Sequence, residues 1–315
     1  MADYIIYKYL FNRSDDKSLF SKLTKEDAVN QAQEELEKAV KGELFFVKAH
    51  RNRDNDYDRL SYKLLGQKGG ISVLLINNVK RRNYQEGKEE LTLEYHPGCY
   101  VVIDNRPGIA QIAIEKARAF DYDTDLIMRL LKRALDRALG DIGLSIDIQP
   151  KYRPVDFWDT VEEISKKRKD RVKQIVFRFS TENTIGPLEA SEAEMMKMSF
   201  LTSLLTAFDG AEGVFGIKSK ENKSLTLDRT RQDAAFVIDM CSRNGYEIAV
   251  HFQKSGVFRT DKEVQLMRTL DDAYILSFTR GEMDMFNGCG HLGVWLDDIH
   301  ETILIDEKKA LEGGR

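Results

Sequence analysis

The chain has 315 residues, of which 42% are hydrophobic and 32% are charged, and its formal net charge at pH 7 is -4. This length predicts two modules rather than one average domain. The near balance of charge excludes a global basic field, so any contact with nucleic acid or anionic lipid needs a local patch.

Cysteine usage and hydropathy predict a cytoplasmic protein. The three cysteines, Cys99, Cys241 and Cys289, are an odd number at wide spacing, which is typical of buried thiols in a reducing cytosol and not of a disulfide framework. The residues from Met1 onward carry no signal-peptide pattern, and apolar runs such as 73–76 are too short to cross a bilayer. We therefore expect no membrane insertion.

The first module, residues 1–155, is predicted to contain both strands and helices. Runs rich in β-branched and aromatic residues predict strands at 4–11, 44–49, 71–76, 91–95, 100–104, 109–115 and 144–148. Helical spacing of apolar residues predicts one helix between Thr24 and Gly42 and another between Asp123 and Gly140. Turn-forming residues at 105–108 predict that the strands on either side of them form a hairpin.

The second module, residues 156–315, has the clearest topological pattern. Strands are predicted at 172–179, 213–218, 224–228 and 246–252, with helices at 191–209 and between Thr230 and Asn244. This βαββαβ order is that of a ferredoxin-like module, with its core at about 172–253. A helix at 261–270 and strands at 273–278 and 293–296 are predicted to follow. The fold class is therefore α+β, with mixed or antiparallel sheets and helices packed on one face.

Motifs of nucleotide hydrolysis and nucleophilic catalysis are missing from the sequence. No glycine-rich loop is followed by Lys and then Ser or Thr, and no Gly-x-Ser-x-Gly occurs. The glycine cluster at 66–70 has no helix start beyond it, so it predicts a tight turn rather than a phosphate site. We expect no cofactor, and we favour a protein that is not an enzyme.

A metal-dependent nuclease is the alternative from the enzyme class. Nucleases of the restriction type combine an Asp with a Glu-x-Lys on adjacent strands, and the predicted hairpin would carry Asp104 and Glu115 to one edge. However, Lys116 directly follows Glu115, and in a strand this points its side chain to the opposite face. An ion pair or a solvated loop is the simpler interpretation of these residues.

A second group of metal-ligand residue types lies near the C-terminus. Cys289, His291, Asp297, Asp298 and His300 fall within twelve residues. A zinc or manganese site needs three or four such groups that converge on the ion. The Cys-x-His spacing lacks the periodicity that points side chains together, so we expect a glycine-bracketed loop followed by a half-buried strand. Cys289, His291 and His300 are kept as candidate ligands.

Two local basic clusters are candidate contacts to nucleic acid. The first is formed by Lys166, Lys167, Arg168 and Lys169, with Arg171 and Lys173 after it, and the second by Lys80, Arg81 and Arg82, with Tyr84 after it. Lysine and arginine neutralise phosphates, and a tyrosine ring stacks on a base. Acidic residues lie close to both clusters in the sequence, so a solvated face is the alternative.

These observations favour a non-catalytic binding subunit that acts with other proteins, or with DNA or RNA, in a bacterial-type cytosolic complex. The predicted helix at 191–209 supports a protein partner, because its apolar residues exceed one narrow stripe. We associate a chain of this kind with a defence-type system, by analogy and not by physics. A homo-oligomeric structural or interaction protein is the third hypothesis, in which the same helix forms a subunit contact.

Overall fold

The computed structural model describes residues 1–13, 25–49, 57–86, 89–180, 184–185, 212–221, 223–244, 246–281 and 290–312. The chain forms two compact units. Unit 1 comprises Met1–Ile148 and Met267–Leu296, and unit 2 comprises Gln149–Leu266 and Asp297–Arg315. The modules predicted from the sequence, 1–155 and 156–315, were each one continuous stretch, whereas unit 1 also contains a late segment of the chain.

Helices and antiparallel sheets build both units, which confirms the α+β class. None of the described helices is both long enough and apolar enough to cross a lipid bilayer.

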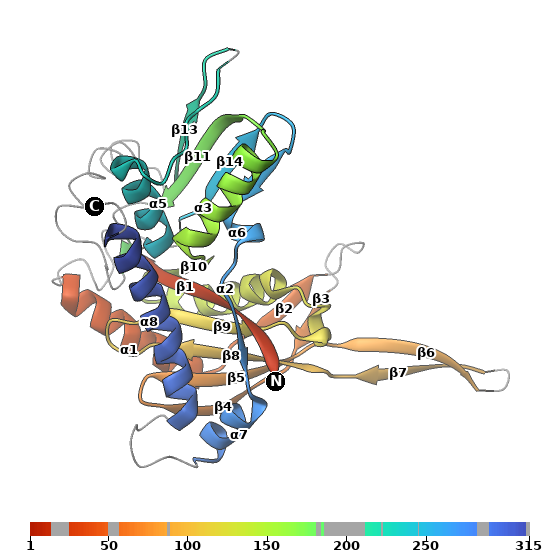
Figure 1. Ribbon diagram of the computed structural model, residues 1–315. Coiled ribbons are helices and arrows are strands. Elements are labelled where there is room, and N and C mark those ends of the chain that lie inside the picture. The colour runs from red at the N-terminus through yellow and green to blue at the C-terminus, as the bar shows by residue number, and fades with distance from the viewer. Residues whose placement is uncertain are drawn as a thin grey trace. The chain divides into compact units, whose positions relative to one another are not determined.

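Unit 1 is organised around one sheet (Figure 1). Its strands follow the order β10 (Leu144–Pro150), β1 (Ala2–Arg13), β9 (Gln111–Glu115), β8 (Gly98–Asp104), β5 (Ile71–Asn77) and β4 (Tyr62–Lys68). The continuous apolar runs of β5 and β8 are buried along most of their length, which is why these strands lie in the interior of the sheet. A late strand, β16 (Met267–Leu270), pairs antiparallel with the first residues of β1, with Ala2 opposite Leu270.

Helix α2 (Thr124–Gly140) illustrates how the sequence forms these elements. The side chain of Asp123 caps its first turn by accepting the N–H of Leu126 at 2.8 Å. Its buried face consists of apolar residues at helical spacing: Ile127, Leu130, Leu131, Ala134, Leu135 and Leu139. The helix contacts α1 (Lys25–Lys41), β2 (Phe46–Ala49) and β9. Both helices predicted for the first module are thus confirmed.

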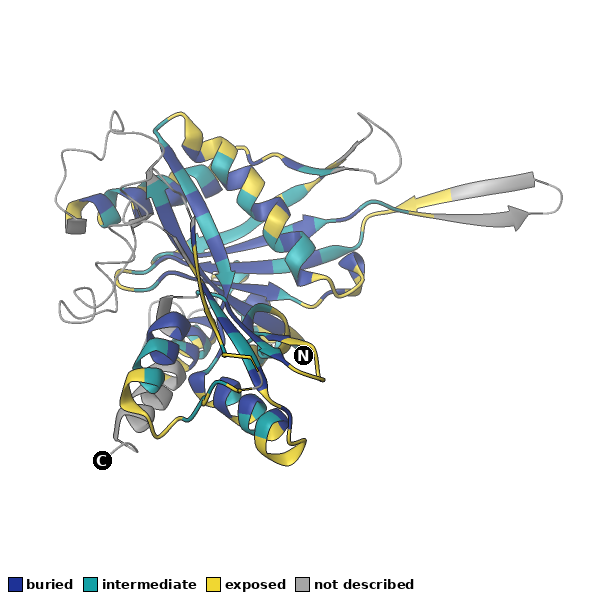
Figure 2. Cartoon of the chain, turned by 90° about the horizontal axis from the view of Figure 1, so that it is seen from above, coloured by how far each residue is buried: buried dark blue, intermediate teal, exposed yellow. Residues whose placement is uncertain are grey.

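Unit 1 also contains two two-stranded antiparallel ribbons outside the main sheet. One pairs β2 with β3 (Tyr57–Leu60), and the other pairs β6 (Lys80–Glu86) with β7 (Glu89–Tyr95). The β6–β7 ribbon projects from the unit and is hereafter called the arm (Figure 1). Residues are exposed where the arm leaves the sheet (Figure 2). A short 3-10 helix, η1 (Arg118–Phe120), lies between β9 and α2.

Unit 2 contains an antiparallel sheet of order β13 (Glu212–Lys218), β11 (Val172–Ser180), β14 (Ile248–Phe252) and β15 (Val257–Arg259). Its helices are α3 (Pro154–Glu162), which continues into the π-helical turn η2 (Glu163–Lys167), α5 (Gln232–Asn244) and α6 (Thr260–Glu263). Residues from α3, α5, β11 and β14 share one hydrophobic core that includes Phe157, Trp158, Phe177 and Val250. A two-residue strand, β12 (Thr184–Ile185), is also assigned.

The ferredoxin-like order predicted for the second module is not confirmed. The predicted helix at 191–209 lies outside the described residues, and the described residues 224–228 form no strand. In the segment 224–228, the Leu225 N–H donates a hydrogen bond to the carbonyl of Val172 in β11 at 2.9 Å.

Three predictions beyond residue 260 were wrong. The predicted helix at 261–270 is divided between α6 and β16, because the last residues pair with β1. The predicted strand at 273–278 is helix α7 (Asp272–Arg280), which the Asp271 side chain caps by accepting the Ala273 N–H at 3.0 Å and which ends at Gly281 with φ 70°. The predicted strand at 293–296 lies within helix α8 (Gly290–Glu312).

Candidate functional site

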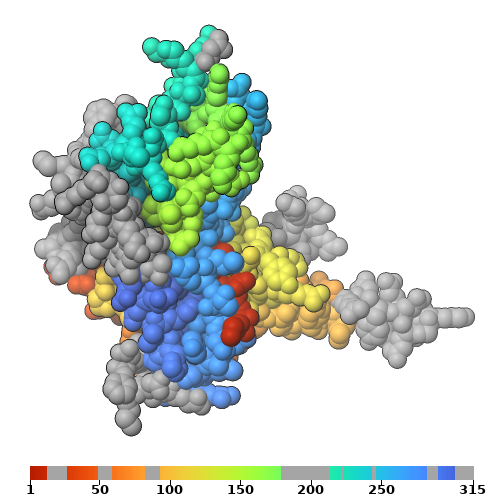
Figure 3. Space-filling model, viewed as in Figure 1, coloured from red at the N-terminus to blue at the C-terminus, as the bar shows by residue number. Residues whose placement is uncertain are grey.

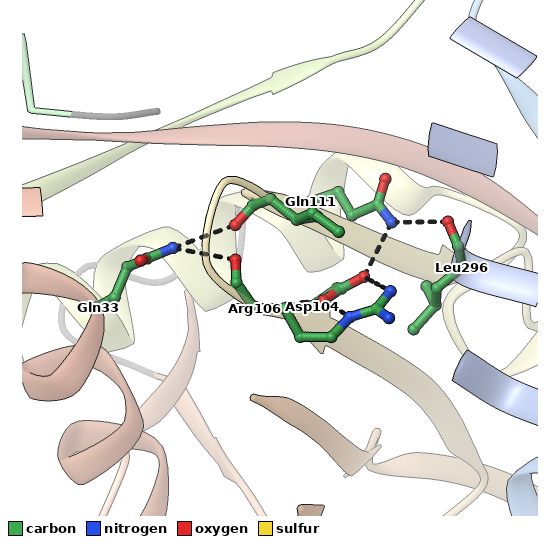
Figure 4. A network of polar contacts seen from close by, with 6 residues as sticks. Gln33, Asp104, Arg106, Gln111 and Leu296 are labelled. Atoms are coloured by element: carbon green, nitrogen blue, oxygen red, sulfur yellow. Dashed lines mark hydrogen bonds and ion pairs between the residues drawn. The ribbon is translucent and has the colours of Figure 1, made fainter. Parts of the chain in front are cut away.

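Asp104, a residue of the nuclease hypothesis, is the centre of a buried polar network at the end of β8 (Figure 4). Arg106 donates to both of its carboxylate oxygens, from Nε at 2.8 Å and from Nη2 at 2.7 Å. Gln111 donates to the same carboxylate at 3.1 Å and to the Leu296 carbonyl at 3.2 Å. Across the turn, Gln33 of α1 donates to the Arg106 carbonyl at 3.5 Å. The network therefore ties the β8–β9 turn to α1 and to the start of α8.

Glu115 lies at the opposite end of the same pair of strands. The register places Asp104 opposite Gln111, and Glu115 is four residues farther along β9, about 13 Å away at 3.3 Å per residue. Its carboxylate accepts the Tyr100 N–H at 2.8 Å. Burial raises the pKa of Glu115, and the Tyr100 N–H opposes this rise. The structure thus does not bring Asp104 and Glu115 together, and the two carboxylates are too far apart to share one ion.

The candidate metal ligands near the C-terminus are also spread out. His291 is exposed, and its ring stacks on Tyr274 with centroids 5.0 Å apart. His300 is nine residues farther along α8, about 13.5 Å along a helix axis. Cys289 lies outside the described residues. Within the described part of the chain, no group of three or more His, Cys, Asp or Glu residues is arranged to hold a metal ion.

In the second basic cluster, at the root of the arm, Lys80 and Arg81 have acidic partners, and the side chain of Arg82 lies outside the described part of the structure. Lys80 forms an ion pair with Asp121 at 2.7 Å and donates to the Arg118 carbonyl at 3.1 Å. The Lys80 ammonium lowers the pKa of Asp121 accordingly. Arg81 pairs with Glu94 of β7 at 3.0 Å. Lys80 and Arg81 therefore carry charges that are already partnered within unit 1.

The first basic cluster, Lys166 to Lys169, ends the α3–η2 helix of unit 2. All four side chains are exposed. Lys166 pairs with Glu162 at 3.3 Å and Arg168 with Glu163 at 2.7 Å, both on the same helical segment. Cations at this place are also favoured by the negative end of the helix dipole.

Asp170, directly after this cluster, joins it to another segment of the chain. Its buried carboxylate accepts the N–H groups of Arg171 at 2.7 Å, Lys254 at 3.0 Å and Ser255 at 2.7 Å. Burial on its own would raise the pKa of Asp170, but the hydrogen bonds from Ser255, Lys254 and Arg171 outweigh it and hold this pKa at about 2. The Gln253 N–H also donates to the Arg171 carbonyl at 2.9 Å. The turn after β14 is therefore fixed beside the basic cluster, and it brings the exposed Lys254 there.

The loop after β13 is fixed to the same end of the sheet. The Ser219 N–H donates to the Lys173 carbonyl at 2.8 Å, and Lys173 Nζ donates to the Lys223 carbonyl at 2.8 Å. Lys218 lies opposite Gln174 in the register of β13 and β11. Atoms of 154–180 (green), 212–221 (cyan) and 246–259 (blue) meet at this end of unit 2 (Figure 3).

We call this surface the basic end of unit 2. It consists of Lys166, Lys167, Arg168, Lys169, Arg171, Lys173, Lys218, Lys220, Lys223 and Lys254. The acidic side chains next to these basic residues are Glu162, Glu163 and Glu221, in addition to the buried Asp170, and Asp228 lies near Lys166. The local charge is therefore strongly positive, although the whole chain carries a net negative charge.

Sequence reasoning singled out the first part of this surface but missed Lys218, Lys220, Lys223 and Lys254. The strands that carry them were predicted. If these strands had been placed in one antiparallel sheet, the end of β13, the start of β11 and the end of β14 would have fallen at the same edge.

Unit 2 also contains a partly open apolar pocket of about 490 Å³ lined by residues of β11, β13 and α5. Its lining includes Trp158, Phe177, Phe215 and Cys241. Burial raises the pKa of Cys241, so its thiol stays neutral and is not an activated nucleophile.

No family matches the chain, and no curated protein is similar to it in sequence.

Proposed function

We propose that this chain is a non-catalytic binding subunit that contacts DNA or RNA through the basic end of unit 2, as part of a bacterial-type cytosolic complex. The observation that carries the proposal is the convergence of three chain segments: Asp170 and its backbone donors hold the η2–β11 loop against the turn after β14, and Lys173 holds the loop after β13. We associate this binding subunit with a defence-type system.

The chemistry of this surface suits a phosphate backbone. Exposed lysines from several rigidly connected loops match an extended row of negative charges, and each neutralised phosphate releases counterions. Phe177, which would be a stacking residue on an RNA-binding sheet, is instead 6% exposed within the core. We therefore expect contacts to the backbone, with strong salt dependence and little sequence preference.

A ferredoxin-like order in unit 2 stays a prediction, and this proposal does not depend on it. In that order, the first strand lies between the third and the fourth, and both neighbours run antiparallel to it. In unit 2, β11 lies between β13 and β14 and is antiparallel to both, but β13 covers the predicted second strand, and the predicted third strand at 224–228 is not formed, so the pairing of β11 with β13 does not support that order. The same fold carries many functions, so the proposal rests on the basic end and not on the topology.

Fluorescence anisotropy with labelled single- and double-stranded DNA and RNA, titrated at several salt concentrations, tests the proposal. The combined variant Lys167→Glu, Lys220→Glu and Lys254→Glu changes one lysine in each of the three segments. We expect the wild-type chain to bind. On double-stranded DNA, the slope of log affinity against log salt should become shallower by about 0.9 for each phosphate that the variant no longer neutralises. Unchanged affinity of the variant would contradict the proposal.

Lys262→Glu is the matched control for Lys254→Glu. Both lysines are exposed in unit 2, but Lys262 follows β15, at the end of the sheet away from the turn at 253–256. Lys254→Glu is expected to weaken binding and Lys262→Glu to leave it nearly unchanged. Equal effects would indicate attraction by net charge alone. The same titrations with Mn²⁺, followed by gel electrophoresis, test the nuclease alternative: metal-dependent cleavage would replace the proposal.

A further inference from the structure

Strand β13 is an edge strand of the unit 2 sheet, because among the described strands it pairs only with β11. Just beyond its end, the Ser219 N–H donates to the Lys173 carbonyl, whereas the Arg178 N–H points the other way, to the Glu247 carbonyl beside β14. Backbone groups alternate in direction along an antiparallel strand, so those of residues 214, 216 and 218 point to the outer edge of β13. Within the described part of the chain, no hydrogen bond reaches these outward groups. Such an edge can be completed by a strand from another chain.

The same strand carries three large apolar side chains that are exposed. Val214 is 66% exposed, Phe215 is 41% exposed and Ile217 is 42% exposed. Phe215 and Ile217 are two residues apart, so they share a face of the sheet, and both line the apolar pocket beside α5. Large exposed apolar residues that are grouped in this way indicate a protein contact.

Gly216 lies between these apolar residues, and the fold of unit 2 does not require a glycine there. Its φ lies outside the left-handed region, and the register of β13 with β11 passes through it without a bulge. The nearest atom to an added Cβ would be Nε2 of Gln174, at 3.3 Å and at the end of a flexible side chain. A glycine inside a regular strand often marks a place where another backbone approaches closely.

The apolar residues of β13 select one register for pairing with a second copy of the strand. In an antiparallel pair with twofold symmetry, the residues whose backbone groups point outward face each other, so the axis can pass through residue 215, 216 or 217 with most of the strand still paired. An axis at Gly216 places Phe215 of each copy opposite Ile217 of the other. An axis at residue 215 would place Ile217 opposite Gly213, and an axis at residue 217 would place Phe215 opposite Ser219. The register centred on Gly216 is therefore the one that pairs these two exposed side chains with each other.

Charges on the other face of the strand are compatible with this register. Lys218 of each copy lies opposite Val214 of the other, where its aliphatic stem can cover the exposed valine. The two Lys218 side chains then lie at opposite ends of the paired strands, so like charges do not face each other. Arg178, which neighbours Val214 in the register of β11 and β13, already pairs with Glu247 at 3.6 Å.

We propose that the outer edge of β13 binds the same edge of a second copy of this chain, antiparallel about Gly216. The two four-stranded sheets then form one continuous sheet with a twofold axis perpendicular to it. This axis keeps the apolar pockets of both copies on the same face, beside the joined strands. The contact does not depend on nucleic acid, and it would place one basic end at each end of the joined strands.

Proline substitution at the centre of the edge tests the proposal in the full-length chain. Gly216→Pro removes an N–H that points outward and keeps the hydrogen bonds between β13 and β11. Val257→Pro is the matched control: the Phe252 N–H donates to the Gly256 carbonyl, so the N–H of Val257 points to the outer edge of β15, on the other side of the same sheet. Sedimentation velocity is expected to show a dimer, with twice the chain mass of 36.2 kDa, for the wild type and Val257→Pro and a monomer for Gly216→Pro. A monomeric wild type, or a dimeric Gly216→Pro, would overturn the proposal.

A cross-link gives a positive signal that does not depend on loss of structure. Residues in a hydrogen-bonded antiparallel pair have Cα atoms about 5.5 Å apart, a separation that suits a disulfide. Gly216→Cys is therefore expected to form a covalent dimer on mild oxidation, whereas Val257→Cys and the oxidised wild type are not. The native Cys99 and Cys241 are buried. Equal cross-linking of the two variants, or none in Gly216→Cys, would refute the register centred on Gly216.

Discussion

At the scale of single residues, Asp104 shows how a carboxylate suited to catalysis serves structure instead. The sequence placed it at the end of a strand, and that position was predicted correctly. The residues that bind its carboxylate were not predicted from the sequence. They are Arg106, two residues later in the chain, and Gln111, which lies opposite Asp104 in the register of β8 and β9. Fully paired and buried, this carboxylate stabilises the β8–β9 turn.

Arg106→Leu is expected to destabilise unit 1 by about 3 kcal/mol, because it leaves a buried carboxylate without its cation. Urea unfolding followed by circular dichroism measures the change. Arg59→Leu is the control, since it removes an ion pair with Glu43 that is exposed on both sides and a cation–π contact with Phe45, and each contributes at most about 1 kcal/mol. The additional change Asp104→Leu should restore part of the loss. Similar effects of Arg106→Leu and Arg59→Leu would show that the Asp104 network adds little stability.

At the scale of secondary-structure elements, Asp170 connects the α3–η2 helix to the turn after β14. Asp170→Ala is expected to lower the free energy of unfolding at pH 7 by about 2 kcal/mol, because three backbone N–H groups lose a charged acceptor. The exposed Asp159→Ala serves as control. The same variant should also weaken nucleic-acid binding, since the turn that carries Lys254 is then less firmly held.

The pH dependence of this stabilisation follows from the lowered pKa. In the folded chain the pKa of Asp170 is about 2, below its ordinary value of 3.8. The ionised carboxylate therefore stabilises the folded state above pH 4, and this contribution is lost as the pH falls through about 2. The difference in unfolding free energy between wild type and Asp170→Ala should shrink as urea titrations move from pH 7 to pH 3. A constant difference would mean that the carboxylate charge is not what stabilises the turn.

Elements with a strong local pattern were predictable from the sequence, and elements defined by distant pairing were not. The apolar stripe and cap of α2 identify the helix without any tertiary information. Strand β6 was missed because consecutive basic residues hide its alternation, and it forms by pairing with β7. Strand β16 was missed because its partner, β1, lies at the other end of the chain. Helix α7 was missed although Asp271 and Gly281 mark its ends.

Only the part of the candidate site that is continuous in the sequence could be predicted. The Lys166–Lys169 cluster is continuous in the sequence and was found, whereas Lys220 and Lys254 reach it only through the antiparallel order of β13, β11 and β14. A basic surface assembled from strand ends needs the sheet topology as well as the composition. For this reason the separation of Asp104 from Glu115 also emerged only with the register of β8 and β9.

At the scale of the whole molecule, the division of the chain into units predicts how its fragments behave. Fragment 149–266 contains every residue of the unit 2 core from Tyr152 to Phe258, so it is expected to fold alone and to melt cooperatively. Fragment 1–148 lacks β16 and leaves the start of β1 unpaired on one side. Joining 267–296 to it through a flexible linker should raise its melting temperature. Thermal circular dichroism compares the two forms, and equal melting temperatures would show that the late segment adds nothing to the stability of unit 1.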